Sequence, residues 1–462
     1  MNFFKKTWRW IDDRSGITDA LKPLLGHPVP PDSRWLYVFG SATLFCFLLQ
    51  VFTGVALALL YQPSSDNAYS SLLYIMDEAP LGKYLRGIHY FGASGMIVMM
   101  GLHLIRVYMM AAYKYPREMS WISGVVLLVL VVSMGFTGQL LRWDDNGVWS
   151  AIVAAEQIGR VPFIGKPLAH LLIGGETLGG KSLSRFFTYH VFLFPALLFA
   201  TVGFHLYLVV RNGISEPPKR GRPVDPKTYR TWYNDMLKRV GVPFFPYAAW
   251  RDAVFGAATI VAVVILAAWL GAPPVEKPPD PSMVHATPRP DWYLLWVYAL
   301  FALMPANIES YAIVFAPPLV LFGLFALPFV SNKGERSPLR RPWSIVGVVL
   351  VVTVVGTLLL VGNKAPWSPH FDAKLSGVNI PTQNTNALVG RTLFEQKACI
   401  TCHTINGNGG ITGPDLSHVA KRLNEEQMMV RIVNGSDNMP AYGRSLHGEE
   451  LQQLVAFLKT LK

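Results

Sequence analysis

The feature that most constrains this chain is a series of seven long apolar stretches. Each is close to the ~20 apolar residues that a helix needs to cross a bilayer. The stretches cover residues 35–61, 84–110, 121–141, 186–210, 253–271, 311–330 and 343–362. We therefore expect an all-α membrane protein built as a seven-span transmembrane helical bundle.

Composition supports this class. Only 15% of the 462 residues are charged and 51% are hydrophobic, whereas soluble domains average about 25% charged residues. This balance excludes a disordered chain and argues against an ordinary soluble enzyme. Three cysteines exclude a disulfide scaffold. The net charge of +12 indicates basic cytoplasmic loops in so apolar a chain, so we expect a lipid bilayer partner and no nucleic acid.

Two further segments suggest surface helices. The apolar run 292–305 has about 14 residues, which is too short to span, and predicts an interfacial or re-entrant helix. The first 16 residues are amphipathic with Lys5, Lys6 and Arg9. They lack the apolar core and cleavage site of a signal peptide, and they predict a helix lying on the cytoplasmic surface.

Basic residues gather in three loops that share one side if the spans alternate. Segment 211–239 holds eight Lys and Arg residues, segment 333–341 holds four, and Lys114 and Arg117 follow the second span. The positive-inside rule places this side, with the N-terminus, in the cytoplasm. A multi-pass protein of the bacterial inner membrane is expected, with everything after residue 362 on the outer, periplasmic face.

The pattern divides the chain into six parts. We expect an N-terminal surface amphipathic helix (1–32), a four-helix bundle (33–215), a cytoplasmic loop (216–247), a three-span part (248–362), a linker (363–384) and a small polar domain (385–462).

Four histidines lie inside two of the spans. His89 and His103 are 14 residues apart, and His190 and His205 are 15 apart. Fourteen residues rise about 21 Å in nearly four turns, so each pair lies near one helix face at two depths. Both spans run inward, so His89 and His190 share the outer level and His103 and His205 the inner level. A single intramembrane histidine is as often a packed core residue, but four at matching depths predict two bis-histidine haems.

The 15-residue spacing turns the second histidine about 100° further, and we expect Pro195 to bend the helix and absorb part of this rotation. Four glycines repeat the 14-residue spacing in spans one and three: Gly40, Gly54, Gly124 and Gly138. They predict room for haem at both levels, although small residues also serve close helix packing.

Three arginines lie near the ends of the histidine-bearing spans: Arg86, Arg106 and Arg185. Two roles are possible for these arginines. They could pair with haem propionates, or they could extend to the membrane interface.

A third haem is predicted in the C-terminal domain. Cys399, Cys402 and His403 form a CxxCH motif, the attachment signature of c-type haem, with His403 as the proximal ligand. A zinc site or a thioredoxin-like motif would need a second cysteine pair or a βαβ pattern, and neither is present. Covalent haem attachment occurs outside the cytoplasm, in agreement with the topology.

Met439 is expected to be the other axial ligand, since a ligand near the end of the domain is required and a thioether raises the potential of the iron. His418 and His447 are the rival ligands.

The sequence resembles cytochrome b of the quinol-oxidising cytochrome bc complexes, with a class I cytochrome c fused behind it. Segment 85–118, which ends in Pro-Arg-Glu, looks like the second span of that family. Segment 184–187, which leads to His190, looks like its fourth span. Residues 290–293, Pro-Asp-Trp-Tyr, match the signature of the outer quinol-oxidation site.

The resemblance implies a function. Asp291 and Tyr293 would serve quinol oxidation at the outer face. One electron would pass to a Rieske iron–sulfur protein in another subunit and one to the two b haems, with coupled proton translocation. The fused domain would relay electrons to an outer acceptor such as a cytochrome c, and the complex would be a homodimer. Aspartate at position 291, where glutamate is commoner, tends to accompany menaquinol.

Three features refine the resemblance. The longer histidine spacing and the seven spans are similar to the chloroplast-type complex. Cys46 falls where the chloroplast-type protein attaches a further haem, although a buried small hydrophobe is the usual role of a free cysteine. Arg142 stands where the family usually has proline.

Two other functions belong to different classes. A dihaem membrane anchor that conducts electrons between a dehydrogenase and quinone, without bifurcation, would not need the Pro-Asp-Trp-Tyr segment. A non-redox transporter would need neither the four histidines nor the CxxCH motif.

Overall fold

The computed structural model describes residues 2–175, 178–279, 288–364, 375, 384–397, 399–409, 414–435, 439, 442–443 and 446–462. Within these ranges the side chains of residues 2, 306, 307, 401 and 402 are not described. The chain forms two compact units, one of residues 1–141, 182–274 and 311–354 and one of residues 142–181, 275–310 and 355–462. Each unit is described by itself.

Seven helices in the described residues are long and apolar enough to cross a membrane, which confirms the predicted spans. They are α3 (Phe39–Ala58), α5 (Gly82–Met109), α6 (Glu118–Leu140), the continuous segment Gly180–Asn212, α13 (Ala249–Leu270), Ile308–Val330 within α15 (Ala306–Val330), and α16 (Pro342–Lys364). Their sequences are mostly apolar, as helices that face lipid require.

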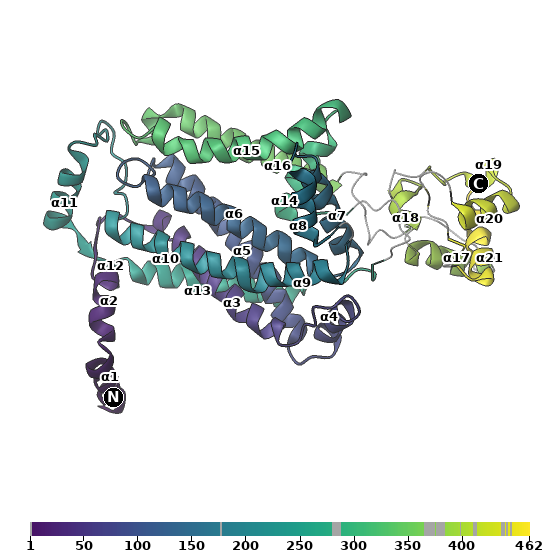
Figure 1. Ribbon diagram of the computed structural model, residues 1–462, viewed down its shortest axis with the longest axis horizontal. Helices are drawn as coiled ribbons and strands as arrows, with labels where there is room; N and C mark the ends of the chain where they lie inside the picture. Colours follow the sequence, from purple (N-terminus) through teal and green to yellow (C-terminus); the bar gives the residue numbers. More distant parts are fainter. Residues whose placement is uncertain are drawn as a thin grey trace. The chain divides into compact units, whose positions relative to one another are not determined.

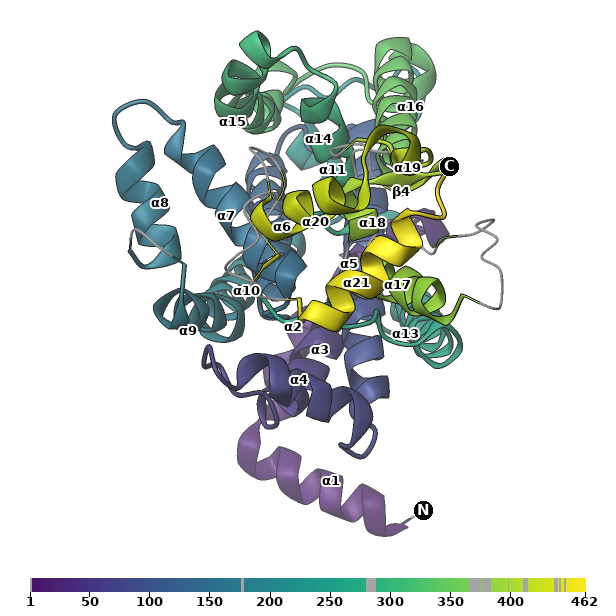
Figure 2. The same cartoon turned by 90° about the vertical axis from the view of Figure 1, so that its right-hand side faces the viewer.

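The first unit is built around four of these spans. Helix α3 packs on α5, α6 packs on the fourth span, and α13 lies against both α3 and α5, as can be followed in Figures 1 and 2. Midway along the bundle, a buried apolar cluster joins the helices through Cys46, Phe47, Met96, Val131 and Leu198. The predicted helical bundle is thus present.

The fourth span is not one regular helix. It consists of α9 (Gly180–Thr188), a π-helical turn η2 (Tyr189–Leu193) and α10 (Phe194–Asn212). The N–H of Phe194 bonds to the carbonyl of Tyr189, five residues back. Pro195 has no N–H to offer Val191 and its ring crowds that carbonyl. The expected irregularity is therefore a widened turn directly before Pro195.

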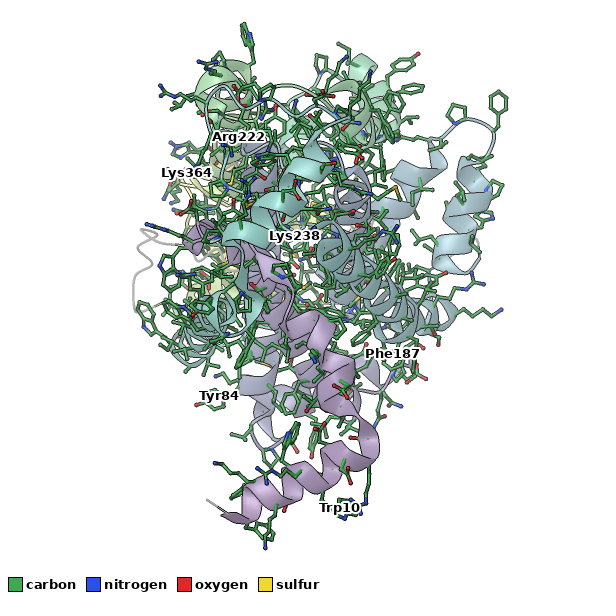
Figure 3. All side chains as sticks on the ribbon, turned by 90° about the vertical axis from the view of Figure 1, so that its left-hand side faces the viewer. Trp10, Tyr84, Phe187, Arg222, Lys238 and Lys364 are labelled. Atoms are coloured by element: carbon green, nitrogen blue, oxygen red, sulfur yellow. The ribbon has the colours of Figure 1, made fainter. Side chains whose placement is uncertain are left out.

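The N-terminal segment is two helices rather than one. Helices α1 (Asn2–Ser15) and α2 (Ile17–Leu25) are separated by Gly16, whose φ of 63° is the left-handed region. Aromatic side chains of α1 are exposed, as Trp10 illustrates in Figure 3. Exposed aromatics beside basic residues are the pattern of a helix at a membrane interface.

Short elements connect the spans of this unit. They are β1 (Pro28–Val29), η1 (Trp35–Tyr37), α4 (Ala68–Asp77), α11 (Tyr229–Val240), β2 (Val242–Pro243), α12 (Phe244–Tyr247) and η3 (Pro338–Arg340). Strands β1 and β2 pair antiparallel, with Pro28 opposite Pro243 and Val29 opposite Val242.

The three basic loops contact one another directly. Arg117 donates from Nε to the carbonyl of Gly213 at 2.8 Å, and Lys114 donates from Nζ to the carbonyl of Lys333 at 2.5 Å. Loops that share contacts lie at the same end of the bundle, as alternating spans require.

The second unit contains a helical hairpin that was not predicted from the sequence. Helices α7 (Asp145–Gly159) and α8 (Gly165–Ile173) pack through Ala155, Ala169 and Ile173. The short apolar run forms α14 (Trp292–Ala302), which is too short to span, as expected. Gly362 of α16 packs directly on Leu295 and Ala299 of α14.

The C-terminal region is mainly helical. Its elements are α17 (Thr385–Gln396), α18 (Cys399–Cys402), β3 (Thr404–Ile405), β4 (Asn408–Gly409), α19 (Val419–Arg422), α20 (Glu425–Asn434) and α21 (Gly448–Leu458). Helices α17 and α21 cross with Phe394 against Phe457 at 5.6 Å between ring centroids. The two-residue strands β3 and β4 pair antiparallel, a small departure from the expected all-α domain. Of the expected linker, the structure describes only Leu375 and Asn384 beyond the end of α16.

Candidate functional site

The four intramembrane histidines form two facing pairs. The rings of His89 and His190 have centroids 6.2 Å apart and planes at 74°. Two imidazoles that bind one metal ion through bonds of about 2 Å have centroids about 6 Å apart. His103 and His205 lie close enough for their charges to interact. The predicted pairing by depth is therefore the arrangement of the side chains.

Each of the four glycines faces one histidine. A Cβ added to Gly54 would lie 3.3 Å from His89, and one added to Gly40 would lie 3.0 Å from His103. The corresponding distances are 2.7 Å from Gly138 to His190 and 3.6 Å from Gly124 to His205. The repeated glycines let the imidazole rings lie directly against α3 and α6, where a side chain would displace them, and this fits histidines that are held in place for a prosthetic group.

Hydroxyl side chains hold three of the histidines at Nδ1. The Oγ1 of Thr53 lies 2.9 Å from Nδ1 of His89, and the Oγ of Ser123 lies 2.8 Å from Nδ1 of His205. Nδ1 of His190 lies 3.1 Å from the carbonyl of Met134 and 3.3 Å from Oγ1 of Thr137.

These contacts select one tautomer of the imidazoles. Thr53 donates its own proton to the carbonyl of Leu49 at 2.7 Å, and Ser123 donates to the carbonyl of Ser120 at 3.0 Å. Each hydroxyl oxygen is therefore left to accept from Nδ1–H of its histidine. The Nε2 lone pair stays available for a metal, as in most histidine ligands.

The inner level also holds an uncompensated cation. Arg106 stacks on the ring of Tyr37 at 3.7 Å. Within the described residues, the buried Nε and Nη2 of Arg106 and the hydroxyl of Tyr37 have no hydrogen-bond partner. A buried guanidinium requires an anion, and the propionates of a haem held by His103 and His205 would meet that requirement. Two bis-histidine haems thus fit the residues present.

Arg86 is placed differently. Arg86 donates to the sulfur of Met76 at 3.0 Å and to the carbonyl of Pro273 at 2.5 Å. It ties the start of α5 to the segment after α13.

Cys46 is completely buried in the apolar cluster between the two histidine levels. Its sulfur lies 3.5 Å from the position of a Cβ added to Gly95. Gly40 and Gly54, which face the inner and outer histidines, lie on either side of it in α3. The packing favours the small buried hydrophobe over a point of haem attachment.

The Pro-Asp-Trp-Tyr segment leads into α14. Asp291 stands at its N-cap position, and Tyr293 donates from its hydroxyl to Oδ2 of Asp291 at 3.4 Å. The carboxylate is partly buried. The two residues predicted to act together are therefore in contact.

Arg142 lies beside this motif in the second unit. Its guanidinium forms ion pairs with Asp144 at 2.6 Å and Glu276 at 3.4 Å. Neither carboxylate was singled out from the sequence, because nothing local in segment 142–147 shows that it meets residue 276.

In the C-terminal region, the first four residues of the CxxCH motif form α18. His403, the last residue of the motif, directly follows this helix. Its Nδ1 donates to the carbonyl of Pro414 at 2.8 Å, which leaves Nε2 free. Burial lowers the pKa of His403, so the imidazole is neutral at pH 7. Cys399 and Met439 both pack on the domain core. The side chain of Cys402 lies outside the described residues, as do Asn438 and Pro440, which flank Met439.

The two rival histidines have structural partners. Nδ1 of His418 bonds to the carbonyl of Lys462 at 2.8 Å. His447 caps α21 in a reciprocal capping box with Glu450. Because an Nδ1 contact of the same kind leaves Nε2 of His403 free, these contacts do not select the second axial ligand, and Met439 stays a prediction.

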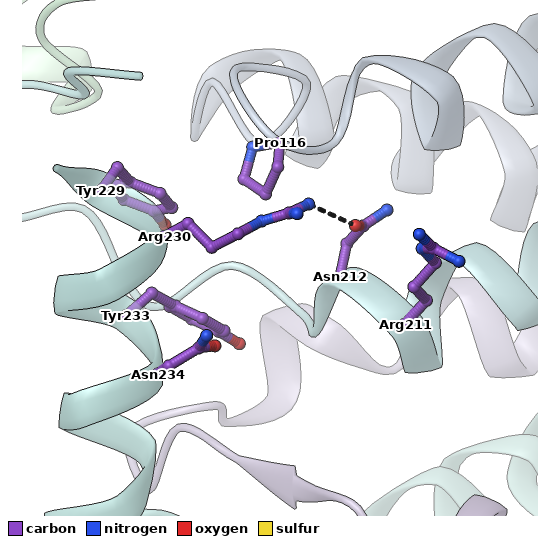
Figure 4. A pocket seen from close by; sticks show the side chains of 7 residues that line it. All are labelled: Pro116, Arg211, Asn212, Tyr229, Arg230, Tyr233 and Asn234. Carbon is purple, nitrogen blue, oxygen red and sulfur yellow. Dashed lines mark hydrogen bonds between the residues drawn. The ribbon is translucent and has the colours of Figure 1, made fainter. Parts of the chain in front are cut away.

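A small polar cavity lies between α10 and α11. Arg211, Asn212, Tyr229, Arg230 and Tyr233 line it together with Pro116 and Asn234 (Figure 4). Its volume of about 150 Å³ is below the ~300 Å³ at which small-molecule sites begin. We assign it no ligand.

Comparisons with known proteins agree with this geometry. The family model described as "Cytochrome b/b6/petB" matches residues 24–213, and "Cytochrome b(C-terminal)/b6/petD" matches 278–374. "Cytochrome C oxidase, cbb3-type, subunit III" matches 385–458.

Relatives and a solved structure point the same way. "Cytochrome b6" of Synechococcus sp. (strain JA-3-3Ab) is 39% identical over 46% of this chain and 99% of its own length. "Menaquinol:cytochrome c reductase cytochrome b subunit" of Geobacillus thermodenitrificans is 39% identical over 46% and 98%. A chain of the structure titled "Hyperthermophilic respiratory Complex III" has a TM-score of 0.65 and 29% identity, over 77% of this chain and 91% of that one. This integral membrane chain therefore belongs to the cytochrome b/b6 family and carries a c-type cytochrome region at its C-terminal end.

Proposed function

We propose that the chain is the cytochrome b subunit of a bc-type menaquinol:cytochrome c oxidoreductase, catalytic only within its complex. The observation that carries this proposal is the combination of two level-matched histidine pairs with the Asp291–Tyr293 contact at the start of α14. A dihaem conduit for a dehydrogenase would need only the first of these. The name of the Geobacillus relative and Asp291 both support menaquinol as the substrate.

The residues of this chain have distinct roles in the proposal. His89 with His190, and His103 with His205, would each hold one haem b, while Cys399, Cys402, His403 and Met439 would hold one haem c. When bound, these groups supply one-electron carriers. Thr53, Ser123 and Thr137 keep three imidazoles oriented with Nε2 inward, and Arg106 balances anionic charge at the inner level.

Asp291 would act as a proton acceptor at the outer site. A carboxylate near the substrate hydroxyl is suited to general base catalysis, and the hydroxyl of Tyr293 holds it in place. Of the two quinol electrons, one would go to a Rieske iron–sulfur protein and the other to this chain. Protons would leave on the outer side, and quinone reduction near the cytoplasmic face would take protons up.

The complex is proposed to lie in a bacterial inner membrane as a homodimer. The basic loops that meet at one end of the first unit would face the cytoplasm with the N-terminus. The C-terminal region would then lie on the periplasmic side, where it would relay electrons to an outer acceptor such as a cytochrome c.

The test is menaquinol:cytochrome c reductase activity of the purified complex with its Rieske partner. Asp291→Asn should lower kcat/KM by about 10²-fold or more, the usual contribution of a general base, and leave the haem spectrum unchanged. Glu309→Gln is the matched control, since Glu309 makes a half-exposed ion pair with Arg160 at 3.6 Å. Unchanged, pH-independent quinol oxidation in Asp291→Asn would contradict the proposal.

A further inference from the structure

Arg142 is the centre of a charged cluster built into the second unit. It donates to Oδ2 of Asp144 from Nε at 2.9 Å and from Nη2 at 2.6 Å, and Nη2 also donates to Oε1 of Glu276 at 3.4 Å. Asp144 is completely buried. It also accepts the N–H groups of Gly147 at 2.9 Å and Glu276 at 3.1 Å. These contacts fix where Arg142 and Glu276 lie.

The same contacts connect the cluster to the quinol motif. The N–H of Asp145 bonds to the carbonyl of Lys277 at 2.9 Å, and the N–H of Arg289 bonds to Oδ1 of Asn146 at 2.9 Å. The start of α7 thus holds both the segment with Glu276 and the segment that leads into Asp291. Burial alone would lower the pKa of Arg142, but the carboxylates of Asp144 and Glu276, and to a smaller extent that of Asp291, raise it.

The carboxylates differ in how firmly they are held. Asp144 accepts two hydrogen bonds from Arg142 and two from backbone N–H groups, and these bonds hold its carboxylate in place. Glu276 accepts a hydrogen bond from Nη2 of Arg142 at 3.4 Å. Burial raises the pKa of Glu276 to about 7, the cation of Arg142 opposes this, and Asp144 and Asp145 add to the rise. Near neutral pH, Glu276 can therefore both accept and release a proton.

We propose that Glu276 is a second proton acceptor of the outer quinol site, beside Asp291, and that Arg142 holds it ready to accept. The inference rests on the proposed function. Quinol oxidation breaks two O–H bonds and releases two protons and two electrons. Asp291 and Glu276 each take one proton, and the two electrons leave through the Rieske partner and this chain. Arg142, where the family usually has proline, is then a positioning residue.

The first test is the pH profile of kcat/KM for menaquinol oxidation by the whole complex, between about pH 5.5 and 8.5. A carboxylate accepts a proton only when ionised, so the wild-type rate should fall below pH 7. Glu276→Gln should lose this acid limb and have kcat/KM about 10²-fold lower above pH 7. Glu309→Gln, which removes the half-exposed partner of Arg160, should keep both the rate and the limb.

Variants of Arg142 test the positioning role. Because the cation lowers the pKa of Glu276, Arg142→Leu should move the acid limb to higher pH. Arg142→Lys keeps the positive charge, so its acid limb should stay close to the wild-type pH. A merely structural role would lower the rate equally at every pH in both variants, and that result would overturn the proposal. An unchanged rate and limb in Glu276→Gln would also overturn it.

A direct measurement covers the case in which Glu276→Gln does not assemble. Infrared titration of the wild-type complex should show a carboxyl band that protonates near pH 7 and shifts in Glu276→Asp. Absence of this band would overturn the inference. The proposed function fails separately, since a wild-type complex that does not oxidise menaquinol, or that tolerates Asp291→Asn, would reject it whatever Glu276 does.

Discussion

At the scale of single residues, the haem-binding pattern has a part that could be predicted and a part that could not. The glycines could be found because their spacing equals that of His89 and His103. The hydroxyl partners each directly precede one of these glycines, in the pairs Thr53–Gly54, Ser123–Gly124 and Thr137–Gly138. A helical Ser or Thr usually bonds only to its own helix, so only the packed structure reveals the contact with histidine.

Thr53→Val should change the outer haem without removing it. The substitution keeps the shape but takes away the acceptor for Nδ1–H of His89, so the imidazole donates less electron density to the iron. We expect the midpoint potential of the outer haem to rise by about 20–60 mV, the equivalent of a hydrogen bond of about 0.5–1.5 kcal/mol for a one-electron couple. Thr43→Val is the control, since within the described part of the chain the Thr43 hydroxyl bonds only the carbonyl of Phe39 in the same helix. Equal shifts in both variants, measured by redox titration, would refute the role.

Gly138→Val should remove the outer haem. Even a Cβ at this position would lie 2.7 Å from Cε1 of His190, so the ring must leave the position that binds metal. Pyridine haemochrome spectra should show the content of b haem falling by half while c haem is kept. Gly203→Val tests for a general effect of valine in the fourth span, because nothing lies within 4 Å of a Cβ there. Full b haem content in Gly138→Val would contradict the role of Gly138 in leaving room for the ring of His190.

At the scale of elements, the spans were predictable and their irregularities were less so. The 15-residue spacing and Pro195 predicted a distortion in the fourth span, and the structure has a π-helical turn at His190. A π turn takes up one extra residue. His190 and His205, 15 residues apart, can therefore lie on one helix face, as His89 and His103 do with a spacing of 14 residues. Hydropathy alone could not distinguish this from a bend. The α7–α8 hairpin escaped prediction because its apolar runs are short and mixed with polar residues.

The crossing of α17 and α21 depends on Gly390. A Cβ there would collide with the backbone carbonyl of Gln453, and the neighbouring Cβ of Phe457 would lie at 2.9 Å. Gly390→Ala should destabilise the C-terminal region by about 1–3 kcal/mol, as overpacking does. Thermal loss of the haem c Soret dichroism in the whole chain should therefore occur at lower temperature. Gly448→Ala, where a Cβ meets nothing within 4 Å, should not lower this temperature, and an equal drop in both variants would contradict the crossing.

At the scale of the whole molecule, the sequence was informative because a bilayer limits the possible folds. Uncharged runs specify helices, alternation of the spans specifies which loops share a side, and the contact of Arg117 with Gly213 agrees with that assignment. What could not be predicted are contacts between segments far apart in sequence, such as Arg142 with Glu276. These depend on how the loops fold back, and no local period in the sequence reports it.

The haem content of the purified chain follows from the packing of Cys46. Its thiol is completely buried among Phe47, Met96, Val131 and Leu198, away from both histidine levels, and a covalent haem would displace these side chains. We expect two extractable b haems and one covalent haem per chain, the covalent one attached through Cys399 and Cys402. Cys46→Ala should leave this ratio unchanged in pyridine haemochrome spectra and in a covalent-haem stain. A second covalent haem that disappears in Cys46→Ala would show that the apolar cluster opens to admit a haem. Fewer than two b haems in the wild type would contradict the assignment of the two histidine pairs as haem ligands.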